Sequence, residues 1–300
     1  MTLLNSQTVS SAVPPEPTSR RWTGLSGRRP PSTISVLRTA LLIMGTLIVL
    51  VPMFWLLISS FKTPEELAAR PPGIFPETFS PTNYTEALQS FGFLTYFMNS
   101  VIVTVGATVL TLAINSMAAY AFAKFNFRGR DTLFVITLAM IMIPLQVILI
   151  PVYQVISGLG ITNSLWGLII PAAATPTGVF LLRQYMLTIP DELIEAARID
   201  GAGEFRIFVT IILPLARPAL AVLAIFSVIW RWNDFLWPLI VAQDQSVYTL
   251  PVAIAQFSSQ LVVPFNLVLA MSVLSVLPII IIFLFLQRSI VTGIAQTGLK

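Results

Sequence analysis

The fold is decided by residues 189–214, which read IPDELIEAARIDGAGEFRIFVTIILP. Pro190 and the two acidic residues after it are typical of the first turn of a helix, where a missing N–H and negative charge are favourable. Gly201 can adopt the left-handed conformation that ends a helix. A second helix then follows, and Pro214 is expected to close it. The side chains expected on one side of this second helix are Phe205, Phe208, Ile211 and Ile212.

This predicted helix–turn–helix is amphipathic, and its apolar face needs a partner. A short amphipathic helix can dock into the groove of another protein. More often, an amphipathic loop of this kind lies flat on the surface of a bilayer. The rest of the sequence indicates whether this stretch belongs to a soluble protein or to a membrane protein.

The composition outside this stretch is that of a membrane protein. Of 300 residues, 56% are hydrophobic and 10% are charged, and the mean hydropathy is +0.85. Soluble domains carry about 25% charged residues, so an ordinary soluble enzyme is excluded. The chain contains no Cys and no His, which excludes disulfides, thiol and imidazole catalysis, and metal sites built on those side chains.

A helix needs about 20 apolar residues to cross a bilayer. Six stretches meet this requirement, and the turn residues Gly158–Ser164 separate the third from the fourth. The sequence therefore predicts an all-α membrane protein with six spans, at about 36–58, 96–123, 133–156, 164–187, 218–241 and 265–287.

The positive charges predict the orientation. With both termini in the cytoplasm, fourteen Lys and Arg residues fall on the inner side and only Lys62 and Arg70 on the outer side. The helix–turn–helix then belongs to an inner loop at 188–217. Residues 1–33 are polar and rich in Pro, which predicts a disordered cytoplasmic tail ahead of a membrane domain at 34–300. In the outer loop, Thr63-Pro64-Glu65-Glu66 and Asn83–Glu86 each look like the start of a short helix.

Two spans contain polar features. The second is rich in Gly, Ala, Ser, Thr and Asn, which allow close approach and hydrogen bonding between helices, so we expect it inside the bundle. The fifth contains Arg231, Trp232, Asn233 and Asp234, and charges inside a membrane cost roughly 2.5–3.5 kcal/mol each. These residues are candidates for a polar pathway wall with aromatic faces that suit sugar rings. The alternative is an Arg231–Asp234 ion pair in an interfacial Trp belt.

No Walker-type phosphate loop occurs, so the chain has no usual machinery for hydrolysing ATP. Asp234 is the one acidic residue clearly inside a span, which gives little support to proton-coupled transport. No catalytic residue and no metal site is predicted.

The inner loop resembles the "EAA" loop of binding-protein-dependent ABC importer permeases. The match consists of Glu195-Ala196-Ala197, three residues, Gly201, nine residues, and then Ile211-x-Leu213-Pro214. From about residue 34 onward the chain is similar to the carbohydrate-uptake branch, the maltose-permease-like subunits. The further segments that carry this resemblance are Ser59–Thr63, Asn83-Tyr84, Trp232–Pro238 and Tyr248–Val252.

The resemblance implies a type I importer permease bundle whose inner loop docks in a cleft of an ATPase subunit. Glu195 would pair with a basic group there, the two alanines would permit close approach, and Gly201 would set the turn. Phe205, Phe208 and Ile211 would pack in the cleft or against the permease's own helices, ahead of Pro214.

The resemblance also implies partners. They are a second permease (a heterodimer), two ATPase subunits that hold ATP and Mg, and an extracytoplasmic solute-binding protein, all at the inner membrane of a bacterium. The chain itself would bind no cofactor and no nucleic acid. The outer segment Tyr248-Thr249-Leu250-Pro251 would contact the binding protein.

Three functions follow, in order of preference. The first is import of a sugar or oligosaccharide. The second is import of another solute by the same machinery, such as glycerol phosphate, for which Arg231 alone supplies positive charge. The third is a stand-alone secondary carrier, for which the sequence shows no ion-coupling site.

Overall fold

The computed structural model describes residues 33–71, 73–90, 92–259 and 264–297, and these residues form helices and no strand. The chain divides into two units, Met1–Leu50 and Val51–Lys300. The predicted tail at 1–33 lies outside the described residues except for Thr33, which begins a helix. The first half of the helical elements are α1 (Thr33–Ser59), α2 (Pro64–Ala68), α3 (Thr82–Ser90), α4 (Phe93–Lys124), α5 (Arg130–Ala139), η1 (Met140–Met142), α6 (Leu145–Gly158), α7 (Leu165–Ile169) and α8 (Pro176–Met186).

The second half contains the inner loop and the C-terminal helices. Its elements are α9 (Asp191–Ile199), α10 (Glu204–Ile207), the π-helical turn η2 (Phe208–Ile212), α11 (Leu213–Leu215), α12 (Arg217–Trp232), α13 (Leu236–Val241), η3 (Gln245–Val247), α14 (Leu250–Ser258) and α15 (Phe265–Thr297).

Three described helices are long and apolar enough to cross a membrane, within α1, α4 and α15, at Leu37–Ser59, Phe93–Lys124 and Phe265–Leu284. These correspond to the first, second and sixth predicted spans. Two bent pairs add one span each if each pair is counted as a single broken span. They are α5 and η1 with α6, bent by 108°, and α10 to α11 with α12, bent by 78°.

The stretches predicted as spans at 133–156, 164–187 and 218–241 are not continuous helices. Pro144 breaks the first, and Ile143 before it is extended, as the residue before a proline prefers. The second is α7 and α8 separated by non-helical residues 170–175, and Pro176 opens α8 at a position that suits proline. The third ends at Trp232 and resumes at Leu236.

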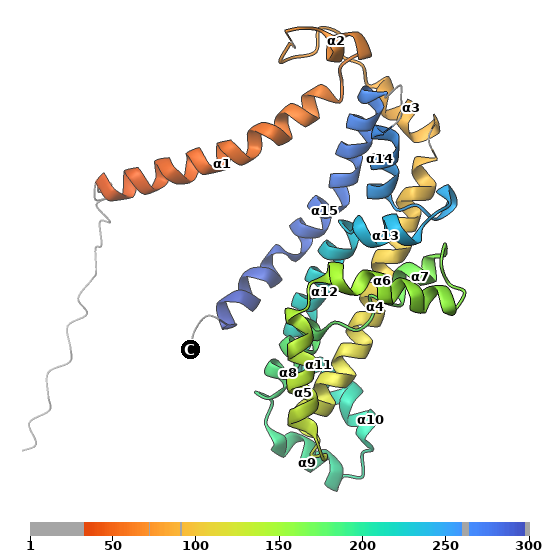
Figure 1. The fold of residues 1–300 in the computed structure, drawn as a ribbon. Helices are drawn as coiled ribbons and strands as arrows, with labels where there is room; N and C mark the ends of the chain where they lie inside the picture. The colour runs from red at the N-terminus through yellow and green to blue at the C-terminus, as the bar shows by residue number, and fades with distance from the viewer. Residues whose placement is uncertain (1–32, 72, 91, 260–263, 298–300) are drawn as a thin grey trace, which may run out of the picture. The chain divides into compact units, whose positions relative to one another are not determined.

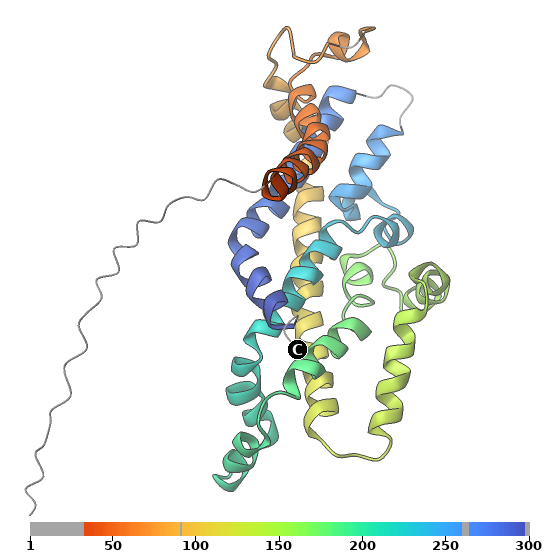
Figure 2. The same ribbon diagram turned by 90° about the vertical axis from the view of Figure 1, so that its left-hand side faces the viewer.

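The prediction that the second span lies inside the bundle is confirmed. Helix α4 runs the length of the second unit, with α9 and α10 at one end and α3 and α14 at the other (Figures 1 and 2). Five of its buried polar side chains reach neighbouring elements. These side chains are Asn99, Ser100, Thr108, Thr111 and Asn115.

The core of the second unit forms three apolar clusters arranged around α4. One cluster packs Tyr120 of α4 with Leu182, Met186 and Ile207 near the inner loop. Another cluster joins α4 to α7, to Ala172 just after α7, and to α13. The third packs the start of α4 against Trp232, α14 and α15. Every cluster therefore contains residues of α4, which makes this helix the common support of the bundle.

The outer segment between α1 and α4 confirms both predicted helix starts. Thr63 and Glu66 form a capping box at α2, with Pro64 in the first turn. Helix α3 begins at Thr82, one residue before the predicted Asn83. The Asn83 side chain is buried and donates to the carbonyl oxygens of Ser60 and Lys62, at 2.9 Å each. This amide therefore fixes α3 to the end of α1.

Helix α8 approaches α4 closely at Gly178. A Cβ atom there would lie 2.3 Å from Asn115 Nδ2 and 2.6 Å from Thr175 Oγ1. We expect Gly178→Ala to destabilise the protein by about 1–3 kcal/mol, because an added methyl in a packed interior forces its neighbours apart. The measurement is thermal unfolding in detergent. Gly158→Ala is the matched control, since a Cβ there meets nothing within 4 Å; equal melting temperatures for the two variants would contradict the close approach.

Candidate functional site: the inner loop and the broken helix

The inner loop folds as the sequence predicts, with a helix, a turn and a second helix. Asp191 and Glu192 lie in the first turn of α9, directly after Pro190. Gly201 has φ +78°, the left-handed conformation that glycine tolerates best. The turn at Asp200–Gly203 then leads into α10.

The second helix does not end at Pro214. The chain passes from α10 through the π-turn η2 into α11, where Pro214 occupies the first turn. The helix ends instead at Leu215, after which the chain bends by 78° into α12.

The predicted loop residues divide into an exposed and a buried set. Glu195, Ala196 and Gly201 are exposed, and Phe205 is 74% exposed. Phe208 is buried in the protein's own core against Tyr120, while Ala197, Ile211 and Pro214 are partly buried. The structure adds Ile199, which is 87% exposed beside the turn.

An exposed apolar pair, Ile199 and Phe205, therefore flanks Gly201. Sequence reasoning did not single out Ile199 on the first helix. The signal was present, since Ile199 is a large apolar residue next to the turn at Gly201.

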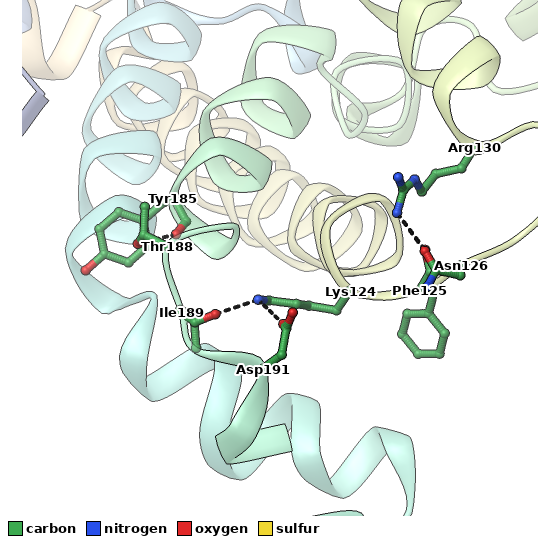
Figure 3. A network of polar contacts seen from close by, with 8 residues as sticks. All are labelled: Lys124, Phe125, Asn126, Arg130, Tyr185, Thr188, Ile189 and Asp191. Carbon is green, nitrogen blue, oxygen red and sulfur yellow. Dashed lines mark hydrogen bonds and ion pairs between the residues drawn. The ribbon is translucent and has the colours of Figure 1, made fainter. Parts of the chain in front are cut away.

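Lys124, at the end of α4, holds the start of α9. Its side chain is only 4% exposed, and its Nζ donates to Ile189 O and to Asp191 Oδ1, at 2.6 Å each (Figure 3). The carbonyl and the carboxylate come from either side of Pro190. The ammonium group thus fixes the entry to the inner loop against α4.

A second polar group ties the far side of the loop to α4. The Glu204 carboxylate accepts a hydrogen bond from Tyr120 Oη at 3.0 Å and pairs with Arg198 Nε at 2.6 Å. The hydrogen bond to Glu204 raises the pKa of Arg198 above its ordinary value, so the guanidinium stays charged. Glu204 therefore connects α4, α9 and α10.

The break between α7 and α8 lies beside polar groups of α4 and α12. Ala172 O accepts from Thr111 Oγ1 at 3.1 Å and from Arg231 Nη2 at 2.8 Å. The Asn115 amide donates to Thr175 Oγ1 and accepts from Thr175 N. Non-helical backbone at membrane depth is tolerated where protein satisfies it or where it lines a cavity. Sequence reasoning expected hydrogen bonds from the second span to other helices. It did not identify Thr111, or Thr175 as the partner of Asn115, because the bonded residues lie about 60 positions apart.

The residues predicted in the fifth span do not act as a pair. No ion pair joins Arg231 to Asp234 in the described part of the chain, because α12 ends at Trp232 and the two residues no longer share a helix face. Asp234 Oδ1 instead accepts from Trp237 N at the start of α13. Trp232 is buried, and its indole N–H donates to Ser275 O. Asn233 is exposed.

The predicted binding-protein segment is held against α4. Thr249 and Leu250 are buried, Tyr248 and Pro251 are partly buried, and α14 begins at Leu250. Two hydrogen bonds from Asn99 Nδ2 to the carbonyl oxygens of Ser246 and Tyr248, and one from Leu250 N to Ser100 Oγ, secure the segment. The exposed residues of this outer segment are Gln243–Ser246, where the backbone N–H of Ser246 lowers the pKa of Asp244.

In the described ranges, no three acidic residues gather where they could hold a metal ion. The site consists instead of a projecting loop clamped to α4 and a broken helix held by polar side chains.

Apolar helices of spanning length, a broken helix beside polar side chains and an amphipathic loop at the end of the bundle define a permease subunit of a membrane transporter. Residues 115–296 match the family described as "Binding-protein-dependent transport system inner membrane component", and the chain belongs to this family. It is thus the transport subunit of an ABC importer and not an enzyme, as the resemblance implied.

Individual relatives agree with this assignment. The arabinooligosaccharides transport system permease protein AraQ of Bacillus subtilis (strain 168) is 36% identical over 272 residues, which cover 90% of this chain and 97% of AraQ. The sn-glycerol-3-phosphate transport system permease protein UgpE of Agrobacterium fabrum is 32% identical over 271 residues, 87% of this chain and 96% of UgpE. A crystal structure of a bacterial ABC transporter that imports the acidic polysaccharide alginate contains a chain with a TM-score of 0.78 and 25% identity, covering 85% of this chain and 95% of that one.

Proposed function

We propose that this chain carries a sugar or oligosaccharide across the inner membrane of a bacterium, powered by partner ATPases and supplied by a solute-binding protein. Residues 34–300 form the membrane domain, with six spans and both termini in the cytoplasm. The arabinooligosaccharide and alginate importers among its relatives support the solute class. A second permease completes the pathway, and ATP and Mg bind to the two ATPase subunits.

The observation that carries this proposal is the exposed apolar pair Ile199 and Phe205 beside Glu195 and Ala196, at the end of the bundle where the loop projects. Exposed apolar side chains next to small and charged ones suit a protein cleft better than water. We assign the ATPase to this surface. The loop orientation set by the positive charges places it in the cytoplasm, where ATP is available.

Arg231, Asn233 and Asp234 remain our candidates for the pathway, with the break at Ala172. From α12, Arg231 donates a hydrogen bond to the backbone of the break. A solute that contacts the break would therefore also contact α12. Trp232 acts in this arrangement through its packing, since it is buried. On the outer side, we place the binding protein over the exposed residues 243–246, with Tyr248–Pro251 as their support.

Replacing Arg231 tests whether the break between α7 and α8 takes part in transport. We expect Arg231→Met to lower the uptake rate by about tenfold or more, since a hydrogen bond from a charged donor contributes about 1.5–3 kcal/mol and Ala172 O would lose it. The measurement is uptake into vesicles at equal permease content. Arg128→Met, at an exposed arginine of the loop after α4, is the control. Unchanged uptake by the Arg231 variant would remove this residue from the pathway.

The solute class is tested by uptake of radiolabelled arabinotriose and sn-glycerol 3-phosphate into vesicles that contain the whole complex and its binding protein. We expect ATP-dependent uptake of the sugar. The UgpE relative favours glycerol phosphate as the second candidate, and uptake of that solute alone would select it. Uptake that continues after ATP depletion, while the membrane gradient is held, would support a stand-alone carrier and overturn the proposal.

A further inference from the structure

We propose that Glu204 is a positioning residue that clamps the coupling helix α9 to the inner end of α4, so that the two helices move as one body during transport. The inference rests on the proposed coupling of the inner loop to an ATPase. It assigns the transmission step to particular side chains of this chain.

Both carboxylate oxygens of Glu204 are used, and each binds a different helix. Oε1 pairs with Arg198 of α9 at 2.6 Å, and Oε2 accepts from Tyr120 of α4 at 3.0 Å. Glu204 itself begins α10. Hydrogen bonds to a charged group are about twice as strong as neutral ones, so one carboxylate makes two strong connections across the turn.

The ion pair between Arg198 and Glu204 spans the turn that contains Gly201. Arg198 precedes this glycine and Glu204 follows it, so the bridge between them closes the turn as a loop. A left-handed glycine at which an added Cβ would meet nothing within 4 Å would otherwise be a natural hinge. With the bridge in place, the turn keeps its shape when α9 is displaced.

Apolar packing and a second clamp oppose any separation of α9 from α4. Ile194 of α9 and Ile207 are buried in the same cluster as Tyr120. The Lys124 ammonium holds Asp191 and Ile189 at the other end of α9 (Figure 3). Helix α9 is therefore fixed near both ends, by Lys124 at its start and by Glu204 at its finish.

The body formed by α4 and α9 also reaches the broken helix, through a part of α4 further from the inner loop. Thr111 and Asn115 belong to the same continuous helix as Tyr120, and they hold Ala172 and Thr175 of the break. A movement of α9 caused by the ATPase is thus carried along α4 to the non-helical backbone. Loss of the Glu204 clamp leaves the end of α9 next to Gly201 held to α4 by apolar packing alone, so that this end can shift relative to α4.

The test uses the absence of cysteine from the chain. Met117→Cys on α4 and Glu192→Cys on α9, both at exposed positions, carry spin labels in the complete complex in lipid nanodiscs. Double electron–electron resonance measures the label separation without nucleotide and with MgATP and vanadate. We expect one narrow distribution, unchanged between the two states.

Tyr120→Phe removes only the hydroxyl that reaches Glu204, and Arg198→Gln removes the guanidinium that reaches it from α9. We expect each variant to broaden the distribution at least about twofold and to make it nucleotide-dependent, since each removes a charge-assisted bond. The double variant should add little to either one, because both act through one carboxylate. Glu204→Gln, which removes the negative charge and leaves one acceptor oxygen for two donors, should broaden the distribution at least as much as either single variant.

Asp131→Ala, at an exposed carboxylate of α5 that pairs with Arg130, is the control and should change nothing. A clamp with a purely structural role would lower the yield of complex and leave the label separation as in the parent. Unchanged distributions in Tyr120→Phe and Arg198→Gln would overturn the inference alone. A parent complex that lacks ATPase subunits or does not hydrolyse ATP would instead overturn the proposed coupling function.

Discussion

Gly201→Val is expected to abolish transport while the protein remains in the membrane at a normal level. Gly201 has φ +78°, and a β-branched residue in the left-handed region costs about 1–2 kcal/mol or more. Nothing lies within 4 Å of a Cβ built there, so the effect comes from the backbone and not from a clash. The turn would open, and α10 would leave the direction that brings Glu204 to Arg198.

The matched control is Gly203→Val, two residues further along the same turn. Gly203 has φ −70° and ψ 156°, a conformation that valine adopts readily, and its Cβ would also meet nothing within 4 Å. The measurement is ATP-dependent uptake in cells, normalised to the permease content of the membrane. Normal uptake by the Gly201 variant, or equal loss in both variants, would contradict the role of the turn conformation.

The second large effect is expected at the exposed apolar pair. Ile199→Ser with Phe205→Ser should release the ATPase subunits from the purified complex. Full burial of one such side chain contributes about 1.5–3 kcal/mol, so losing two weakens binding by a factor of roughly 100 or more. The folded loop should persist, because Ile194, Ile207 and Phe208 keep their buried positions.

Retention of ATPase subunits through purification is the measurement, with Phe127→Ser as the control. Phe127 is an exposed aromatic residue of the neighbouring inner loop between α4 and α5. If the double variant retained its ATPases as well as the parent does, the docking surface would have to lie elsewhere on the chain.

Local signals in the sequence predicted most of the elements that depend on local chemistry. The capping box at Thr63, the helix start after Pro190 and the left-handed Gly201 each follow from a few adjacent residues. The interior position of α4 follows from its small and polar residues. These features depend on sequence neighbours, so no knowledge of the bundle is needed to find them.

The residues at which helices stop inside three predicted spans were not predicted, because hydropathy measures apolar length and not helix continuity. Pro144 precedes α6, residues 170–175 separate α7 from α8, and α12 ends at Trp232. A bundle can satisfy the freed backbone groups through distant side chains. Thr111 and Arg231 do this for Ala172, from about 60 residues away in each direction.

The candidate site was predicted only in part, because some of its residues also depend on contacts between segments that are distant in the sequence. Gly201 and Phe205 were found from the local pattern and Glu195 from the family resemblance, while the clamp formed by Tyr120, Arg198 and Glu204 depends on the approach of α4 to the loop. The Arg231–Asp234 ion pair, one of the two alternatives for the fifth span, does not form in the described residues, because α12 ends at Trp232. Burial of Leu250 likewise depends on Ser100, 150 residues earlier.

The most direct test of the central claim is purification of the protein from native membranes in mild detergent, followed by intact mass measurement of every chain that co-purifies. The account predicts two ATPase subunits and a second permease with this chain, and the loss of the ATPases when Ile199 and Phe205 are replaced by serine. A chain that purifies alone under several detergents, with no ATP hydrolysis in the preparation, would contradict it.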